Sequence, residues 1–411
     1  MSLIKPFTGL RPADGRAEDV VAPPYDVMNA AEARKMVEGR PWSFLHISRP
    51  EVDLPEDVDP YAEKVYAKAA ENLKHMIKEG VLTRDKEASY YIYRLTMGEH
   101  VQTGLVAAAS VDAYDADRIK KHEFTRPVKE DDRVRQVEAL NAQTGPVFLV
   151  YKANKVVDDL LAAVSSHEAH VDVTAKDGVR HEIWVMSETE QVGLLTSEFN
   201  NMDALYVADG HHRSAAASRV AATQKENNEN HTGEEDYNYF LSVVFPHDQM
   251  QILDYNRVIR DLNGMDKDQF LLKVEDAFII EASAEPVKPG KETEFGMYLD
   301  KQWYKLTLAG DVPNDPVARL DISLLSDNLI NPILGVSDPR RDTRIDFIGG
   351  IRGLSELEKR VDSGDWAVAF SFFPTTMEAL MSVADAGEVM PPKSTWFEPK
   401  LADGLVSHVL D

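Results

Sequence analysis

Two pairs of strand-like segments most tightly constrain what this chain can fold into, because a tight turn joins each pair. In residues 89–111, SYYIYRLTMGEHVQTGLVAAASV, two apolar runs flank a turn at Met97-Gly98-Glu99. In residues 170–187, HVDVTAKDGVRHEIWVMS, the Asp177-Gly178 pair is a strong hairpin signal. Strands that are joined by so few residues pair antiparallel, so the sequence predicts antiparallel sheets.

Helical segments alternate with these strand-like runs. Apolar residues recur at helical spacing from Val65 to Ile77, and Gly80 supplies a stop signal. The expected class is therefore α+β, with mixed, largely antiparallel sheets and helices. Because 411 residues exceed one small core, we expect three α/β parts, residues 1–150, 151–260 and 261–411.

Composition excludes several classes of function. Without cysteine, the chain has no disulfide, no thiolate nucleophile and no cysteine-based metal site. Its 45 basic and 70 acidic residues give a net charge of −25, which opposes nucleic acid as a partner. No uninterrupted apolar stretch approaches the ~20 residues that a membrane helix needs, and no signal-peptide core follows the N-terminus. We therefore expect a cytoplasmic protein with no membrane partner.

The most informative stretch is residues 205–222, LYVADGHHRSAAASRVAA. It reads as a buried strand, a tight turn that Gly210 permits, and a helix with an alanine-rich face. A helix N-terminus favours anions, and Arg213 adds a forked donor that suits phosphate or carboxylate. The pattern predicts an anion site with phosphate as the best candidate, formed by Asp209, Gly210, His211, His212 and Arg213.

Simpler interpretations of this turn stay open. Asp209 also suits an N-cap, and the two histidines also suit ordinary core or surface positions. Adjacent helical residues point about 100° apart, so His211 and His212 do not share a metal ion without distant carboxylates.

Two further segments offer polar chemistry. APPYDV places Asp26 directly after a rigid Pro-Pro pair in extended backbone; such pairs more often serve structure, but a stiff backbone also suits a general base. SFLHISRP places His46 and Arg49 near that segment, at the alternating spacing of a strand. Residues 120–133, KKHEFTRPVKEDDR, are dense in charge, a mixture typical of a solvated loop.

Five motifs, spread over essentially the whole chain, carry a family resemblance. They are VVAPPYDV, KKHEFTRPVKEDDR, ADGHHR, RIDFIGG and MPPKSTWFEPK. Together they closely resemble a family of bacterial and archaeal proteins of unknown function, domain-of-unknown-function family 1015. Its members are often described as similar to the SpoOJ/ParA/ParB/RepB group.

The DGHHR segment alone is similar to the phosphate-binding turn of the ParB/sulfiredoxin superfamily. That group includes CTP-binding partition proteins, ATP-using sulfiredoxins and archaeal free-serine kinases. The resemblance implies a ParB/sulfiredoxin-like nucleotide-binding portion in which Gly210, His211, His212 and Arg213 contact the nucleotide. A sulfiredoxin reaction by the chain's own thiol is excluded, because the chain has no cysteine.

The family resemblance also assigns roles in residues 120–133. Lys129 and Arg133 would neutralise phosphates, and Glu123 or Asp132 would hold Mg²⁺ or act as a base. The expected cofactor is a nucleoside triphosphate or diphosphate with Mg²⁺. The expected catalytic residues are His212, Glu123 and Asp26.

These observations predict a nucleotide-dependent enzyme, a phosphotransferase or nucleotide hydrolase that acts on a small metabolite. Its partners would be the nucleotide and a small-molecule phosphate acceptor; a homodimer is left open. One alternative is a ParB-like DNA-binding or regulatory protein, although no basic helix-turn-helix is recognisable. The other is a metal-dependent hydrolase built on His122, Glu123, His211 and His212.

Overall fold

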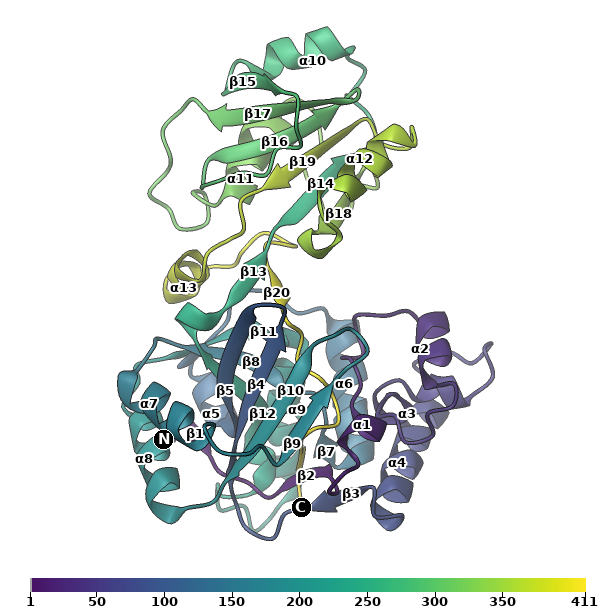
Figure 1. Cartoon of the computed structure of the whole chain (residues 1–411), viewed down its shortest axis with the longest axis vertical. Helices are drawn as coiled ribbons and strands as arrows, with labels where there is room; N and C mark the ends of the chain where they lie inside the picture. The colour runs from purple at the N-terminus through teal and green to yellow at the C-terminus, as the bar shows by residue number, and fades with distance from the viewer. Residues whose placement is uncertain (1) are drawn as a thin grey trace. The chain divides into compact units, whose positions relative to one another are not determined.

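The computed structural model describes residues 2–411, which form two compact units (Figure 1). The first unit contains the described residues up to Met250 together with Pro399–Asp411, and the second contains Gln251–Glu398. The chain therefore leaves the first unit, builds the second, and returns to the first with its last residues. This return brings distant parts of the sequence into one unit.

A nine-stranded mixed sheet forms the centre of the first unit. Most neighbours run antiparallel, whereas the β11–β6 and β12–β8 pairs are parallel. The strand order is β6 (Ile119–Lys120), β11 (Leu205–Asp209), β8 (Val147–Tyr151), β12 (Tyr239–Pro246), β5 (His100–Ser110), β4 (Tyr90–Met97), β10 (Arg180–Met186) and β9 (Val171–Thr174), with β1 (Ile4–Lys5) pairing β5.

Both expected hairpins are present in this sheet. Met97 pairs with His100 across the first turn, where Gly98 has a φ of 61°. The second hairpin joins β9 to β10, with Thr174 opposite Arg180. The predicted α+β class with largely antiparallel sheets is confirmed.

A smaller sheet ties both ends of the chain into the first unit. Its order is β3 (Leu82–Arg84), β2 (Gly9–Pro12), β21 (Ser407–Val409) and β7 (Ala142–Gln143). All of its pairs are antiparallel. The C-terminal strand therefore lies between an N-terminal strand and the strand that follows α6.

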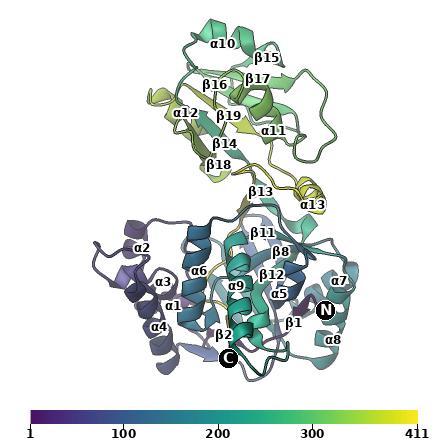
Figure 2. The same ribbon diagram turned by 180° about the vertical axis from the view of Figure 1, so that it is seen from behind.

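Nine α-helices belong to the described part of the first unit, and two of them, α6 and α9, pack against each other. Helix α9 packs against α6, and Figure 2 shows the two side by side. Alanines 216, 217 and 221 of α9 are buried, so the alanine-rich face does allow close packing. The helices of this unit are α1 (Ala17–Val20), α2 (Ala30–Val37), α3 (Leu45–Ser48), α4 (Glu63–Lys78), α5 (Val111–Asp115), α6 (Pro127–Leu140), α7 (Lys155–Val164), α8 (Thr189–Asn200) and α9 (His211–Asn227), with short turns η1 (Pro50–Asp53), η2 (Asp236–Asn238) and η3 (His247–Gln249).

Two local expectations are wrong. The segment around His46 is helix α3 rather than a strand, because the N–H groups of Ser48 and Arg49 donate to carbonyls four residues earlier. Residues 127–133 begin helix α6 rather than continuing a loop. Pro127 stands at the first turn of α6, where its fixed φ suits a helix and its missing N–H costs nothing.

The second unit is built on a six-stranded antiparallel sheet. A separate two-stranded ribbon pairs β13 (Gln251–Leu253) with β20 (Trp396–Glu398). The strands of the large sheet are, in order, β15 (Phe278–Ser283), β17 (Gln302–Leu308), β16 (Glu294–Leu299), β19 (Val368–Phe372), β14 (Tyr255–Ile259) and β18 (Ile345–Gly349). Its helical segments are α10 (Lys267–Val274), α11 (Asp321–Leu325), η4 (Ser326–Ile330), η5 (Gly350–Arg352), α12 (Leu354–Asp362) and α13 (Met377–Asp385). Across residues 2–411, none of the helices combines the length and apolar character needed to cross a bilayer.

Candidate functional site

The turn between β11 and α9 has the geometry that its sequence predicts. Gly210 has a φ of 97°, and a Cβ at this position would lie 3.3 Å from the Cα of Val147. Both the backbone conformation and the space therefore require glycine. Gly210 itself is the N-cap, so Asp209 is not, and α9 begins without a side-chain cap.

Asp209 instead anchors the turn from the strand side. One carboxylate oxygen accepts a hydrogen bond from the backbone N–H of Gly210 at 2.8 Å, and the other accepts from Nζ of Lys400 at 2.9 Å. Although burial raises the pKa of Asp209, the charges of Lys400 and Arg213 outweigh it and hold the pKa below its usual value. Asp209 is thus an ionised, engaged group that shapes the turn.

His211 is buried against His122. Their rings meet edge to face with centroids 4.5 Å apart. The backbone N–H of His122 donates to Nε2 of His211 at 3.5 Å, which leaves the proton of a neutral His211 on Nδ1, 3.8 Å from a carboxylate oxygen of Glu123. Burial lowers the pKa of both rings, to about 4 for His122. The pair is therefore neutral at physiological pH.

His212 joins the start of α9 to the start of α6. Its Nε2 accepts a hydrogen bond at 3.0 Å from the backbone N–H of Arg126, the N-cap residue of α6. Like α9, α6 begins without a side-chain cap. Two uncapped helix N-termini therefore lie side by side, and their partial positive charges add at one place.

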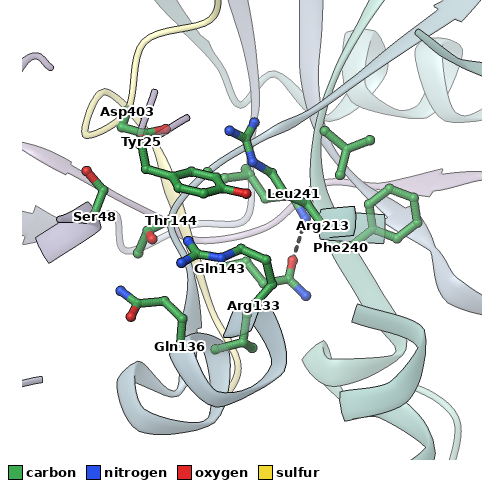
Figure 3. A pocket seen from close by; sticks show the side chains of 13 residues that line it. Tyr25, Ser48, Arg133, Gln136, Gln143, Thr144, Arg213, Phe240, Leu241 and Asp403 are labelled. Carbon is green, nitrogen blue, oxygen red and sulfur yellow. Dashed lines mark hydrogen bonds between the residues drawn. The ribbon is translucent and has the colours of Figure 1, made fainter. Parts of the chain in front are cut away.

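A pocket opens beside this turn (Figure 3). It encloses about 480 Å³, its opening to solvent included. Its walls combine charged, amide, hydroxyl and apolar groups. The lining residues are Tyr25, Ser48, Arg133, Gln136, Val137, Gln143, Thr144, Gly145, Val147, Arg213, Phe240, Leu241 and Asp403.

Two arginines of the pocket share one aromatic ring. The guanidinium carbons of Arg133 and Arg213 lie 3.9 Å and 5.3 Å from the ring centroid of Tyr25 (Figure 3). The Tyr25 backbone is held in turn by Arg49, which donates to its carbonyl at 2.7 Å. The rigid APPYDV segment therefore positions an aromatic ring that orients two cations.

Arg213 is mostly covered, with its side chain 15% exposed, and its charge is well compensated. It donates to the carbonyl of Pro146 at 2.9 Å and lies 3.7 Å from a carboxylate oxygen of Asp26. Although burial lowers the pKa of Arg213, the carboxyl groups of Asp26 and Asp403 raise it above its usual value. Arg213 is therefore a fixed, permanent cation in the pocket wall.

Of the remaining predicted residues, one lies at the turn and the others lie on α6. Glu123 stays at the turn, beside His211. Asp132 is buried, and its two oxygens accept hydrogen bonds from Tyr66 at 2.8 Å and from Arg133 at 2.7 Å. Lys129 lies on the first turn of α6, with Nζ 3.3 Å from the hydroxyl of Tyr61.

The proposed metal ligands do not form a cluster. Within residues 2–411, no group of three or more His, Asp or Glu side chains is arranged to hold a metal ion. His122, Glu123 and His211 are neighbours, but burial keeps the two imidazoles paired with each other. The metal-hydrolase alternative therefore lacks a ligand set among these residues.

Sequence reasoning missed Lys400 and Asp403. Both belong to the segment that returns from the second unit, and Lys400 is 191 residues away from Asp209 along the chain. Lys400 is the last residue of MPPKSTWFEPK, so that motif was the available signal. The spacing of residues along the chain gives no sign that this motif lies beside the β11–α9 turn.

The chain belongs to the family described as "Protein of unknown function (DUF1015)", whose model matches residues 4–323. A search of curated protein sequences finds no relative of this chain.

Several solved structures are similar to this chain at low identity. A free serine kinase variant in complex with AMP is 13% identical, with 73% of this chain and 88% of that chain covered and a TM-score of 0.35. A conserved hypothetical protein from Pyrococcus furiosus is 13% identical, with 72% and 94% covered and a TM-score of 0.34. SbnI with a C-terminal truncation, from Staphylococcus aureus, is 11% identical, with 72% and 84% covered and a TM-score of 0.37. These likenesses are too distant to place a ligand or a reaction in this chain.

Proposed function

We propose that the β11–α9 turn and its pocket bind the phosphates of a nucleotide, and that the protein transfers a phosphoryl group to a small metabolite. The observation that carries this proposal is the meeting of two uncapped helix N-termini, with the guanidinium of Arg213 on the first turn of α9. Each of these features favours an anion, and a phosphate oxygen can accept hydrogen bonds from both.

The local carboxylates limit how a phosphate can bind. Asp26, Asp132 and Asp209 already balance the cations of the pocket wall, so a bound phosphate must rely on helix N–H groups and on the remaining faces of the guanidiniums. Phosphoryl transfer depends mainly on such positioning and on charge stabilisation. The net charge of −25 argues against nucleic acid, whereas a small anion needs only the local cations of the pocket.

The roles expected from the sequence fit this proposal unequally. Gly210, His212 and Arg213 would face the phosphates from α9, and Lys129 and Arg133 from α6. Glu123 lies at the turn with its side chain half-exposed, so it can reach Mg²⁺ that a nucleotide carries. Asp132 suits this role less well, because both of its oxygens already accept hydrogen bonds. The similarity of the turn to ParB/sulfiredoxin proteins is part of this same proposal.

Calorimetric titration with ATP, ADP and CTP, with and without Mg²⁺, tests the proposal. Arg213→Ala should weaken binding by about 100-fold, because it removes charge-assisted hydrogen bonds worth roughly 3 kcal/mol. Arg219→Ala is the matched control: Arg219 lies on the same helix, half-exposed, and pairs with Asp131. It should leave the affinity unchanged.

A wild-type protein that binds none of these nucleotides would overturn the proposal. So would an Arg213→Ala variant that unfolds at the wild-type temperature and binds with wild-type affinity. Arg213→Lys separates charge from geometry, since lysine keeps the cation but loses the planar fork.

A further inference from the structure

The wall of the pocket opposite α6 contains a carboxyl group that the proposed function does not yet use. Asp403 is 2% exposed, and its oxygen Oδ1 has no hydrogen-bond partner within residues 2–411. It lines the same pocket as Tyr25 and Arg213 (Figure 3). Leaving a buried acceptor unsatisfied costs free energy, so such a group in a native pocket needs an explanation.

The backbone holds Asp403 in a fixed place. Its N–H donates to the carbonyl of Ala22 at 2.8 Å, and its own carbonyl accepts from the N–H of Ala22 at 3.2 Å. The next residue, Gly404, has a φ of 90°, and a Cβ there would lie 2.7 Å from the ring of Phe44. The returning segment is therefore pinned to the start of APPYDV, which holds the backbone of Asp403 at the pocket wall.

Gly145 lines the pocket next to the free oxygen and to Arg213. A Cβ on Gly145 would lie 3.4 Å from Oδ1 of Asp403 and 3.2 Å from Nε of Arg213. Both groups therefore lie close to Gly145 in the pocket wall, and a ligand that approaches over this glycine would meet an acceptor and a cation. A hydroxyl group suits both contacts, since it donates its proton to a carboxylate while its oxygen faces the guanidinium.

We propose that Asp403 accepts the proton of the acceptor hydroxyl, and that the acceptor is a small alcohol bound beside Gly145. This inference rests on the proposed phosphotransferase function. The hydroxyl oxygen forms a bond to the terminal phosphorus of a nucleoside triphosphate, and the bond from that phosphorus to the bridging oxygen breaks. The bridging oxygen leaves with the electron pair on the nucleoside diphosphate, and the hydroxyl proton passes to Oδ1 of Asp403.

The electrostatics of the pocket suit this role. Burial raises the pKa of Asp403 to about 7, with Asp26 raising it further and Arg213 and Arg133 opposing both. A base is most effective when its pKa lies near the working pH. Tyr25 also faces this group, and burial raises the pKa of its phenol, so the phenol stays neutral there.

A second buried carboxyl group provides a matched control. In the second unit, burial raises the pKa of Asp321 to about 7 as well, and its Oδ2 also has no hydrogen-bond partner within residues 2–411. Asp321 does not line the pocket. Asp403→Asn and Asp321→Asn therefore remove similar groups, of which only one faces the proposed acceptor.

The test measures nucleoside diphosphate release and phosphorylated product between pH 5.5 and 9, with Mg²⁺, the nucleotide that binds, and glycerol, ethanolamine and lactate as acceptors. The wild-type rate should rise through pH 7. Asp403→Asn should bind nucleotide as the wild type does, transfer at least about 100-fold more slowly, and lose the dependence on pH. Asp321→Asn should keep the wild-type rate and pH profile.

Two results would overturn this inference while nucleotide binding stands. One is an Asp403→Asn variant that transfers at the wild-type rate or keeps the rise through pH 7. The other is a wild-type enzyme that binds nucleotide but phosphorylates none of the alcohols. A protein that binds no nucleotide refutes the proposed function itself, so the two failures are distinguishable.

Discussion

Two arginines with little exposed surface, one in each unit, are compensated in opposite ways. Arg213 in the first unit is surrounded by the carboxyl groups of Asp26, Asp209 and Asp403, and its charge faces a pocket. Arg257 on β14 of the second unit is 3% exposed and donates to the backbone carbonyls of Tyr255, Pro392 and Lys393.

The aromatic surroundings of the two arginines also differ. Arg257 lies over two phenylalanine rings, those of Phe347 and Phe372, with its guanidinium carbon 5.1 Å and 4.8 Å from their centroids. Arg213 instead shares the single ring of Tyr25 with Arg133. Burial lowers the pKa of Arg257 to about 9, whereas acidic neighbours raise that of Arg213.

This difference separates an arginine that ties two segments together from one that, in the proposed function, binds an anion. The guanidinium of Arg257 donates to backbone carbonyls and packs against aromatic rings. It therefore ties the Pro392–Lys393 segment to the sheet. Carboxylates compensate Arg213 mainly through charge, at distances such as the 3.7 Å to Asp26, and leave donors directed at the pocket. Burying a charge is costly in both cases, but only the second arrangement leaves it available to a ligand.

The largest effect on stability should come from Arg257→Ala. This substitution leaves a cavity between two phenylalanine rings, and it also removes the donor from the backbone carbonyls. Together these two effects should lower the free energy of unfolding by about 3–5 kcal/mol. Urea unfolding of the full chain measures this, with Arg257→Met as the control that refills the volume without the charge. An Arg257→Ala variant as stable as the wild type would contradict a structural role for Arg257. Replacement of Arg213, by comparison, should mainly affect binding.

The next effect is a pH-dependent gain in stability for Asp403→Asn. The folded pKa of about 7 exceeds the ordinary value of 3.8, so the folded state holds this proton more tightly than the unfolded state. Stability contributed by the protonated carboxyl is therefore present at low pH and is lost as the pH rises towards 7. Between these two pKa values, each rise of one pH unit should lower the free energy of unfolding of the wild type by about 1.4 kcal/mol relative to the variant.

Melting temperatures of both proteins at pH 5, 6, 7 and 8 test this expectation. The difference between variant and wild type should grow up to pH 7 and then level off. A constant difference would show that Asp403 does not change its protonation in this range, and that Arg213 has an ionised counter-charge throughout.

The smallest effect concerns the turn that places Arg213. Gly210→Ala should destabilise the protein by about 1–2 kcal/mol, because alanine is strained at positive φ, and its Cβ also approaches the backbone of Val147. Gly178→Ala is the matched control: Gly178 has a φ of 86°, with no atom within 4 Å of an added Cβ.

Thermal unfolding should show a larger loss of stability for Gly210→Ala than for Gly178→Ala, and only Gly210→Ala should weaken nucleotide binding. Equal losses and equal binding would mean that the close approach to Val147 does not matter.

Local chemistry explains which elements the sequence predicts correctly. Two hairpins follow from turns whose residues can adopt only a few conformations, and the strand–turn–helix around Gly210 follows from the same kind of constraint. The start of α6 was missed, because a run of mixed charges has no apolar periodicity to mark a helix. Its helical state depends on Pro127 and on packing against α9.

The sequence by itself determined the α+β class, the hairpins, and the strand–turn–helix around Gly210 at which it predicts an anion site. Only the tertiary structure decided what surrounds that turn. Asp26 precedes Arg213 by nearly half of the chain, and Lys400 and Asp403 arrive after an entire second unit. Strand β21 pairs with β2 and β7 and so returns these residues to the first unit. Such long-range pairing depends on which sheet edges remain open after folding, and no local pattern of residues encodes it.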